Sequence, residues 1–495
     1  MPEGNIYLWD STDWEAFAIY LNDVDWSSIF SKCSCANNCW ELFSQIIKDG
    51  IQQFVPLRSQ SVKGRLKHSK AVRKLIAKRK KLWQIKRKNP TSANSEAYNN
   101  ASLCFKSAIT SECADRELNV IKSGNLGQFY KHVNSRLNHR SNIAPLLNKD
   151  GVLVTKPIDK AEILNESFVN FGTIDNGIIP MMKDLNIVTS LGIIYFDSTL
   201  IMSCIVKLKA QSAAGPDSFP PIIYKQLAHQ LCEPLAIMFR LLMQFGEIPD
   251  LWKQATVTPI FKKGSSSSPE NYRPISLTCV CCKLFEAGIK FYLMQYLTEN
   301  NFLSPTQHGF LSKHSTCTNL LESLNEWTEG LNMKVDTLVA YVDFAKAFDR
   351  VSIPKLLAKL EHIGITGKLL SCIKSFLTNR SQRVRIDGEL SGSRAVISGV
   401  PQGSVIGPIL FLIYINDVAN SIPYEANAKL FADDLKTCVR VKNNSDEFVF
   451  IDVLEQISNW AEMWQLPLAT AKYCWMDISN KRETVQGPLY LTTSN

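Results

Sequence analysis

Apolar and polar positions alternate most clearly over residues 428–440, AKLFADDLKTCVR, around a central pair of aspartates. The pattern predicts two short strands joined by a tight turn that carries Asp433 and Asp434. An Asp-rich turn is also common where no chemistry occurs, because Asp side chains bond to the local backbone. Residues 337–351 predict a second apolar strand, which ends at Asp343 and turns into a helix. Two strand-borne acidic sites of this kind can hold divalent metal ions between them.

Helical patterns dominate the first 140 residues, whereas strands and helices alternate from about residue 254. Residues 257–261 and the stretch that starts at Tyr272 predict a hairpin with a serine-rich tip. Residues 176–197 show no clear period, so we expect a loosely held linker there. The patterns predict a helical basic region at 1–140, a linker at 141–211, and an α/β (α+β) domain at 212–495 with its core motifs in 255–475.

The basic residues of the chain are concentrated in one segment. The chain has 55 Lys and Arg residues against 46 Asp and Glu, and residues 63–88 hold 13 of the basic residues and no acidic one. Such a block is typical of a phosphate-backbone contact or a nuclear-import signal. A solvated charged helix is the alternative. The candidate nucleic-acid contacts are Lys74, Lys78, Arg79, Lys80 and Lys81.

The cysteines and the apolar runs bear on where the protein resides. The 14 Cys residues sit mostly in apolar runs of a long chain, so we expect reduced thiols and no structural disulfides. The N-terminus lacks the pattern of a signal peptide. The longest apolar stretch, residues 409–415, is too short to span a bilayer. We therefore expect an intracellular protein of the nucleus, the cytoplasm or both, with no membrane partner.

The paired acidic sites match the needs of phosphoryl transfer to a hydroxyl group. That reaction uses two divalent cations roughly 3.5–4 Å apart, and Mg²⁺ prefers oxygen ligands. Asp343 and Asp433, on neighbouring strands, suit the role. Asp434 either completes the second metal site or orients a primer terminus. We expect two Mg²⁺ ions, which Mn²⁺ is able to replace.

Two further stretches are candidates for nucleotide binding. Residues 398–408, SGVPQGSVIGP, form a glycine-rich loop before an apolar helix, and Gly403 lets the backbone approach a base or sugar closely. Free N–H groups at the start of that helix would favour an anion, although an ordinary turn before a core helix has the same pattern. On the predicted hairpin, Lys262, Lys263 and Arg273 can clamp triphosphate oxygens, or can simply be solvated.

Phe348 lies five residues after Asp343. An aromatic ring at this distance from a metal ligand can fall beneath the incoming sugar and leave no space for a 2′-hydroxyl. The alternative is a core phenylalanine on the inner face of the helix.

Several ordered motifs show a resemblance to a known family. The stretches VTPIFKKGS…NYRPISLT, QHGF, YVDFAKAFDRV, SGVPQGSVIGPILF and LFADDLK resemble the reverse transcriptases of non-LTR (LINE-type) retrotransposons, and the jockey-like branch most of all. The resemblance covers residues 212–472. It implies a right-hand fold with fingers and a palm, in which helices back an antiparallel palm sheet and a mostly helical connector precedes them. It also implies an RNA template, a DNA primer and dNTPs as partners.

The resemblance also assigns roles to residues of this chain. It implies metal binding by Asp343, Asp433 and Asp434, and a gate against ribonucleotides at Phe348. Lys472 falls where the family places a lysine that protonates pyrophosphate. The implied nucleotide contacts are Lys262, Arg273, Gln402 and Gly403.

The chain departs from the family pattern at both ends. Only about 140 residues stand where the family has an endonuclease before the connector, and the chain stops at Asn495, where the thumb would begin. His314 also replaces a usual Arg. We therefore expect a truncated copy with most of its thumb missing, and an RNA-directed DNA polymerase by function. The alternative is a catalytically idle remnant that binds nucleic acid, and the sequence does not set the oligomeric state.

Overall fold

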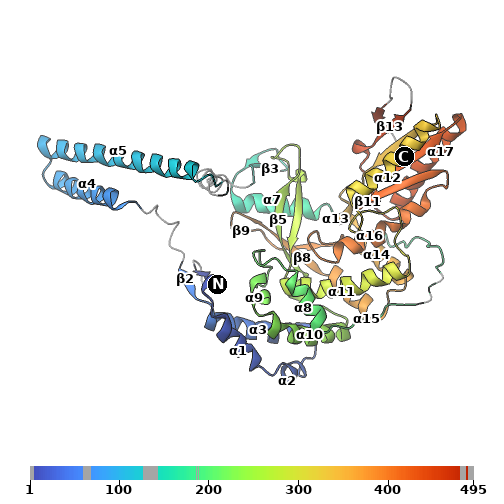
Figure 1. The fold of residues 1–495 in the computed structure, drawn as a ribbon, viewed down its shortest axis with the longest axis horizontal. Helices are drawn as coiled ribbons and strands as arrows, with labels where there is room; N and C mark the ends of the chain where they lie inside the picture. Colours follow the sequence, from blue (N-terminus) through green and yellow to red (C-terminus); the bar gives the residue numbers. More distant parts are fainter. Residues whose placement is uncertain are drawn as a thin grey trace. The chain divides into compact units, whose positions relative to one another are not determined.

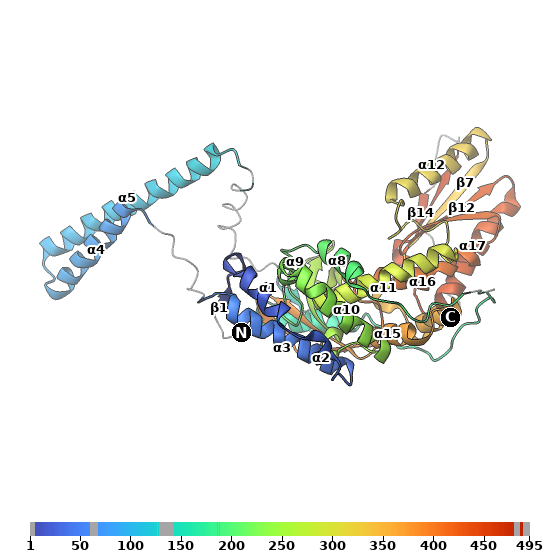
Figure 2. The same cartoon turned by 60° about the horizontal axis from the view of Figure 1, so that its bottom comes forward.

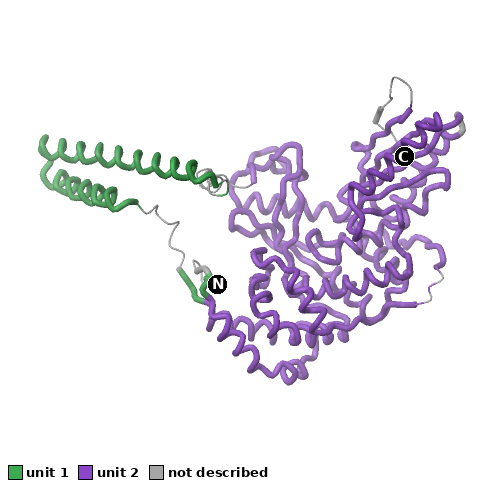
Figure 3. The backbone as a smooth tube through the Cα atoms, viewed as in Figure 1, with its two compact units in different colours: residues 1–11, 56–142 green, residues 12–55, 143–495 purple. Residues whose placement is uncertain are grey.

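The computed structural model describes residues 5–59, 68–125, 127, 143–185, 187, 189–479 and 486–488. The chain forms two compact units, residues 1–11 with 56–142 and residues 12–55 with 143–495 (Figure 3). The three segments expected from the sequence stay a prediction, because these units divide the first 140 residues differently. Among the described residues, no helix has the length and apolar character needed to cross a membrane.

The first unit contains a long helical hairpin, formed by α4 (Lys70–Lys88) and α5 (Ser92–Lys122) (Figure 1). The Ser69 side chain accepts a hydrogen bond from the Val72 N–H at 3.3 Å and so caps α4. Between the helices, the Arg79 guanidinium lies 4.0 Å from the centre of the Phe105 ring. Two short strands, β1 (Asn5–Tyr7) and β2 (Leu57–Ser59), pair antiparallel in the same unit.

The second unit begins with helices that belong to its core. These are α1 (Trp14–Asn22), α2 (Trp26–Phe30) and α3 (Ala36–Phe54). The Trp40 ring of α3 lies 5.4 Å from the Trp252 ring and 6.0 Å from the Phe219 ring. Residues 12–55 therefore share an aromatic core with residues more than 150 positions later. Around that core lie α8 (Ser198–Val206), α9 (Pro221–Gln226), α10 (Ala228–Phe245) and η2 (Asp250–Lys253).

The first sheet of this unit, sheet I, has the strand order β10-β8-β5-β6. Its members are β10 (Arg394–Val396), β8 (Arg380–Ile386), β5 (Gln254–Phe261) and β6 (Tyr272–Leu277), with β9 (Glu389–Leu390) beside β8. The predicted hairpin is confirmed, because β5 and β6 pair antiparallel with Ile260 opposite Arg273. Leu164 and Phe168 of α7 (Pro157–Val169) are buried in one core cluster with Val257. A small hairpin, β3 (Leu146–Leu147) and β4 (Leu153–Val154), precedes α7.

The second sheet, sheet II, has the order β11-β12-β7-β13-β14 and is antiparallel throughout. Its strands are β11 (Ala426–Phe431), β12 (Asp434–Val441), β7 (Asp336–Val342), β13 (Cys474–Ile478) and β14 (Gln486–Pro488). The helices α12 (Thr316–Asn332) and α17 (Asn444–Met463) lie on opposite sides of it (Figure 2). Alternate residues of β12 bond to α12, since Lys436 contacts Ser323, Cys438 contacts Glu326 and Arg440 contacts Glu329.

The helices that join the sheets include α11 (Val280–Glu299) and the predicted apolar helix, α16 (Gly407–Ile415). The others are α13 (Ala347–Arg350), α14 (Ile353–His362) and α15 (Gly367–Leu377). The mixed α/β fold is thus confirmed, with sheet II antiparallel and sheet I mixed, because β5 pairs parallel to β8. The strand that leads to Asp343 is also confirmed, as are the two strands that meet at Asp433 and Asp434.

The expectation of a loosely held linker at residues 176–197 was wrong for its described part. The buried Lys355 ammonium donates hydrogen bonds to the Asn176 side chain at 2.7 Å and to the Ile178 carbonyl at 2.6 Å. Phe196 is fully buried and stacks on Phe285. The segment lacks a period because isolated side chains, rather than a regular element, fix it to the core.

Candidate active site

The register of sheet II brings the acidic residues together at one end. In β7 and β12, Val342 pairs with Leu435. Continuing that antiparallel register by one residue on each strand places Asp343 opposite Asp434. Asp433 precedes Asp434 in the turn between β11 and β12. Three acidic residues from two separate stretches of sequence therefore lie at the same end of one sheet.

The pKa values of Asp433 and Asp434 are both raised. Burial raises the pKa of Asp433, and the negative charges of Asp434 and Asp343 raise it further. The pKa of Asp434 is also raised, first by partial withdrawal of its carboxyl from water and then by the charge of Asp343. Carboxylates that repel one another in this way favour a nearby cation.

Three basic side chains supply positive charge to this cluster. The Lys472 ammonium forms an ion pair with the Asp343 carboxylate. The Asp343 carbonyl accepts a hydrogen bond from the Ala469 N–H at 2.7 Å, which fixes the short turn η5 (Thr470–Lys472) beside it. Lys262 and Arg273 both oppose the rise in the pKa of Asp434. Residues far apart in the chain thus form one charged site.

The basic residues of the β5–β6 hairpin also lie close to the acidic cluster. Partial burial lowers the pKa of Lys262, and the charges of Arg273, Lys472 and Lys263 lower it further, whereas Asp343 opposes the change. Lys262 and Arg273 lie on the same face of the hairpin, because Ile260 pairs with Arg273 and alternate residues share a face. Lys263 is exposed beside Lys262.

The donor atoms of the site suit a hard divalent cation. The three carboxylates offer only oxygen ligands, which Mg²⁺ and Mn²⁺ prefer. Among the described residues, no three His, Cys, Asp or Glu side chains already stand close enough together to hold a metal ion unaided. Lys472 is the present partner of Asp343. The ammonium group bonds to Oδ2 of Asp343, so a metal ion that binds all three acids would compete with it for this carboxylate.

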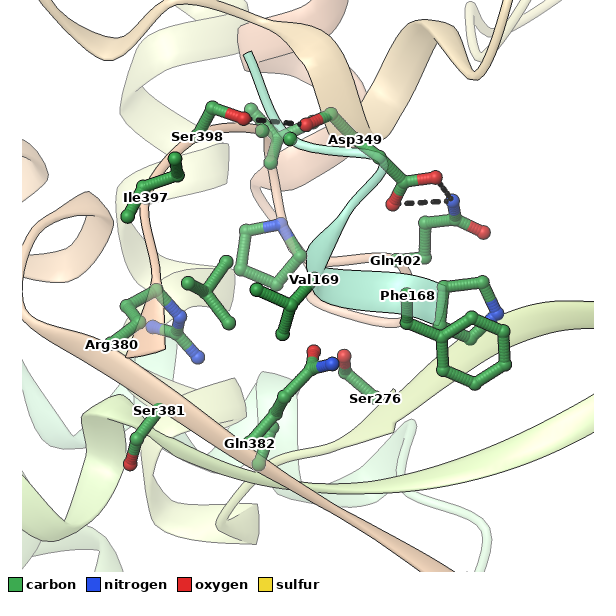
Figure 4. Close-up of a pocket in the computed structure, with 17 residues that line it drawn as sticks. Phe168, Val169, Ser276, Asp349, Arg380, Ser381, Gln382, Ile397, Ser398 and Gln402 are labelled. Atoms are coloured by element: carbon green, nitrogen blue, oxygen red, sulfur yellow. Dashed lines mark hydrogen bonds between the residues drawn. The ribbon is translucent and has the colours of Figure 1, made fainter. Parts of the chain in front are cut away.

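The glycine-rich loop lies against the helix that follows Asp343. The Gln402 amide donates to both oxygens of the Asp349 carboxylate at 2.9 Å (Figure 4). Burial raises the pKa of Asp349 to about 6, against the opposing effect of this bond. Ser398 donates to the Asp349 carbonyl at 2.8 Å. The two segments border a small cavity of about 50 Å³, whose lining also includes Arg380 and Gln382.

Position 403 requires glycine because the loop backbone there lies against Ser276 of β6. Its φ of +109° lies in a region that favours glycine, and a Cβ there would lie 2.6 Å from the Ser276 carbonyl oxygen. The Ser276 N–H also donates to the Gln402 carbonyl at 2.7 Å. The loop is thus bonded directly to β6 of sheet I.

The expected free N–H groups at the start of α16 are not free. The buried Glu286 carboxylate accepts from the Val405 N–H at 2.6 Å and from the Ile406 N–H at 3.1 Å. The Ser404 hydroxyl accepts from the Gly407 N–H at 3.1 Å. This expectation was wrong, because the protein supplies its own anion at that helix end.

Phe348 is half-buried. Its ring stacks on the fully buried Phe411 ring of α16, with 4.3 Å between centroids, and meets the Phe310 ring edge-on at 6.1 Å. One face of Phe348 therefore belongs to the core, and the gate role stays a prediction.

The candidate nucleic-acid contacts on α4 fall into two groups. Lys74, Lys78, Lys80 and Lys81 are exposed. Arg79 differs, because its guanidinium packs on the Phe105 ring of α5.

Sequence reasoning missed three side chains that hold this site. Asp349 bonds to Gln402, Glu286 bonds to the loop before α16, and the Gln307 amide bonds to the turn that carries Asp433. Glu286 offered a signal, since it is an acidic residue inside the apolar run CCKLFEAGI. The other two stand in recognised motifs, but their partners are distant in sequence.

Comparison with known proteins identifies the domain that carries this site. Residues 260–486 match the sequence model of the family described as reverse transcriptase (RNA-dependent DNA polymerase). Over these residues the chain is similar to reverse transcriptases. The match includes Asp343, Asp433, Asp434 and Lys472, so the charged cluster lies inside the matched region.

Its relatives are polymerases of mobile elements, which confirms the non-LTR resemblance. The chain is 28% identical over 298 residues to the RNA-directed DNA polymerase from mobile element jockey of Drosophila melanogaster, covering 58% of this chain and 32% of that protein. It is 26% identical over 360 residues to the probable RNA-directed DNA polymerase from transposon X-element of the same species, covering 70% of this chain and 39% of that one. The chain spans about a third of the length of these curated relatives.

Proposed function

We propose that this chain is an RNA-directed DNA polymerase, which adds deoxynucleotides to a DNA 3′ end on an RNA template. The observation that carries the proposal is the strand register that brings Asp343 opposite Asp434 and next to Asp433, near the charges of Lys262 and Arg273 and within residues that match reverse transcriptases. In this reading sheet I belongs to the fingers and sheet II to the palm.

The three carboxylates would hold the divalent ions that reverse transcriptases use, and we propose two Mg²⁺ ions. When bound, these ions lower the pKa of the attacking hydroxyl and offset charge on the leaving pyrophosphate. Burial, followed by repulsion from neighbouring acids, raises the pKa values of Asp433 and Asp434, and a bound cation would stabilise their charged forms.

The other side chains bind and orient the nucleotide. Lys262 and Arg273, on one face of their hairpin, bind triphosphate oxygens. Gln402 contacts the nucleotide from the glycine-rich loop, and Phe348 excludes the 2′-hydroxyl with its exposed edge. Lys472, already bonded to Asp343, donates a proton to the pyrophosphate oxygen.

The exposed lysines of α4 give a second contact with nucleic acid. Lys74, Lys78, Lys80 and Lys81 lie on a helix with no acidic residue. We propose that they bind phosphates of the RNA without reading its sequence.

Primer extension tests the polymerase proposal. The unaltered chain and an Asp433→Asn/Asp434→Asn variant are compared on poly(rA)/oligo(dT) with Mg²⁺. We expect incorporation by the unaltered chain and a loss of at least about a thousandfold in the variant, since both changes remove metal ligands. Equal incorporation would refute the metal assignment. No incorporation by either protein, with salt-sensitive RNA binding intact, would favour a remnant that only binds nucleic acid.

A further inference from the structure

The turn that presents Asp433 has an unusual backbone. Ala432, the residue directly before it, has a φ of +57°, in the left-handed region that residues with a side chain rarely adopt. No glycine or asparagine is present there to relieve the strain. Something outside the turn must therefore hold the peptide that leads into Asp433.

The side chain of Gln307 bonds to the backbone N–H and to the backbone carbonyl of Ala432. Its Oε1 accepts a hydrogen bond from the Ala432 N–H at 2.9 Å, and its Nε2 donates to the Ala432 carbonyl at 3.4 Å. Oε1 also accepts from the Gly309 N–H at 2.7 Å. Gln307 is only 2% exposed, so water does not compete for these bonds.

The backbone around Gln307 is itself fixed to sheet II. The Leu430 N–H donates to the Thr306 carbonyl at 2.9 Å, and the His308 N–H donates to the Leu430 carbonyl at 2.8 Å. These bonds form a parallel bridge between Gln307 and Leu430. The amide group of Gln307 is thus held in register with the last residues of β11.

Gly309 makes room for this arrangement. A Cβ at Gly309 would lie 2.3 Å from the Ala432 nitrogen, which is closer than real Cβ contacts. The QHGF motif therefore contributes two matched features, an amide that bonds to Ala432 and a glycine that lets the chain approach it.

We propose that Gln307 is a positioning residue for the metal site, which sets the direction of the Asp433 carboxylate by holding the strained Ala432 peptide. The proposal rests on the polymerase function inferred above. Gln307 does not touch the reacting atoms; it acts through the backbone of Ala432. Its loss should weaken divalent-metal binding and slow turnover, while the affinity for primer and template stays the same.

The test compares Gln307→Ala with Asn165→Ala in the full chain. Asn165 is a matched control, because it is also buried and its amide donates to Ser391 at 3.0 Å and to the Gly392 carbonyl at 2.8 Å, away from sheet II. Both variants lose buried amide bonds, so we expect similar falls in Tm. Mn²⁺ binding is measured by electron paramagnetic resonance, and primer extension gives kcat and KM at several Mg²⁺ concentrations.

For Gln307→Ala we expect Mn²⁺ affinity and kcat to fall about tenfold or more, as for other residues that orient metal ligands. The KM for primer–template should change by less than about twofold, and Asn165→Ala should leave metal binding and kcat near those of the unaltered chain. Gln307→Glu keeps the acceptor for the Ala432 N–H and should recover part of the loss.

Other outcomes separate this proposal from the polymerase proposal. A lower Tm with unchanged Mn²⁺ affinity and kcat in Gln307→Ala would overturn the positioning role. A further outcome is that the unaltered chain incorporates no nucleotide while Gln307→Ala still binds Mn²⁺ more weakly than the unaltered chain. That result would support the positioning role and overturn the polymerase proposal. An unaltered chain that binds no Mn²⁺ would overturn both.

Discussion

The Gln402 amide nitrogen lies 2.9 Å from each carboxylate oxygen of Asp349, 53 residues earlier in the chain. This pair joins the glycine-rich loop to the helix that follows Asp343. The Asp349 carboxylate thus orients the amide nitrogen of a side chain that we propose contacts the nucleotide.

Asp349→Asn should therefore raise the KM for dNTPs about tenfold with a smaller change in kcat, because a charge-assisted bond contributes about 1.5–3 kcal/mol. Steady-state incorporation kinetics measure both values. If Asp349 acts through Gln402, adding Asp349→Asn to Gln402→Ala should cause no further loss. Additive losses would show that the two residues act independently.

Asp349 should also make stability depend on pH. Burial raises its pKa from 3.8 to about 6 in the folded chain, so the folded state holds this proton more tightly than the unfolded state. The Asp349 contribution to the unfolding free energy is present at low pH and is lost as the pH rises through about 6. Thermal unfolding from pH 4 to 7 should show this decline in the unaltered chain and less of it in Asp349→Asn. Identical pH profiles would exclude a raised pKa at Asp349.

Replacing Lys472 should separate metal binding from turnover. Lys472 pairs with Asp343, so it competes with a metal ion for that carboxylate. In Lys472→Ala we expect tighter Mn²⁺ binding, but incorporation about a hundredfold slower, because a proton donor is lost. Lys472→Arg keeps the charge without an easily transferred proton, and should be slow without the gain in metal affinity. Full activity in Lys472→Ala would leave this residue an ion-pair partner only.

Phe348→Ala should increase the use of ribonucleotides relative to deoxynucleotides by about tenfold or more, since the ring would no longer exclude the 2′-hydroxyl. It should also cost about 1–3 kcal/mol of stability, because Phe348 stacks on Phe411. Phe348→Tyr keeps the ring and serves as the control. A variant that loses stability but discriminates normally would assign Phe348 to the core alone.

The exposed lysines of α4 should contribute to RNA affinity through their positive charge. Changing Lys74, Lys78, Lys80 and Lys81 to Gln should weaken RNA binding and lower the slope of log affinity against log salt by up to about 3, at roughly 0.7 per phosphate contact. Changing the same residues to Arg should preserve both. Arg79→Ala offers a contrast, because Arg79 packs on Phe105 and should affect the hairpin more than the RNA. Unchanged affinity in the Gln variant would point to a solvated helix or an import signal.

Local patterns in the sequence were enough to predict the strands that carry the acids. Alternation gave the β11–β12 turn, and an apolar run ending in an acid gave β7 and Asp343. The register between Val342 and Leu435, which brings Asp343 to Asp434, depends on pairing across 93 residues and has no local signal. The hydrogen bond between Gln307 and Ala432 spans 125 residues and likewise has no local signal in the sequence.

Where sequence reasoning was wrong, nonlocal contacts explain the difference. The glycine-rich loop predicted open N–H groups, but Glu286 from α11 occupies them. Residues 176–197 have no periodic pattern, but Lys355 fixes their start through its buried ammonium group. In both cases a charged side chain from a distant helix replaces the regular hydrogen bonding that a pattern can reveal.

The contact of Trp40 with Trp252 and Phe219 limits where the chain can be cut to make a folded fragment. A fragment begun after the helical hairpin would lack α3 and leave the Trp252 and Phe219 rings without Trp40, whereas one trimmed to residues 260–486 would lack all three aromatic residues. Such a fragment would be prone to aggregate, and its inactivity would say nothing about the acids. Any shortened version meant to report on catalysis has to retain residues 12–55, even though they lie outside the matched polymerase sequence.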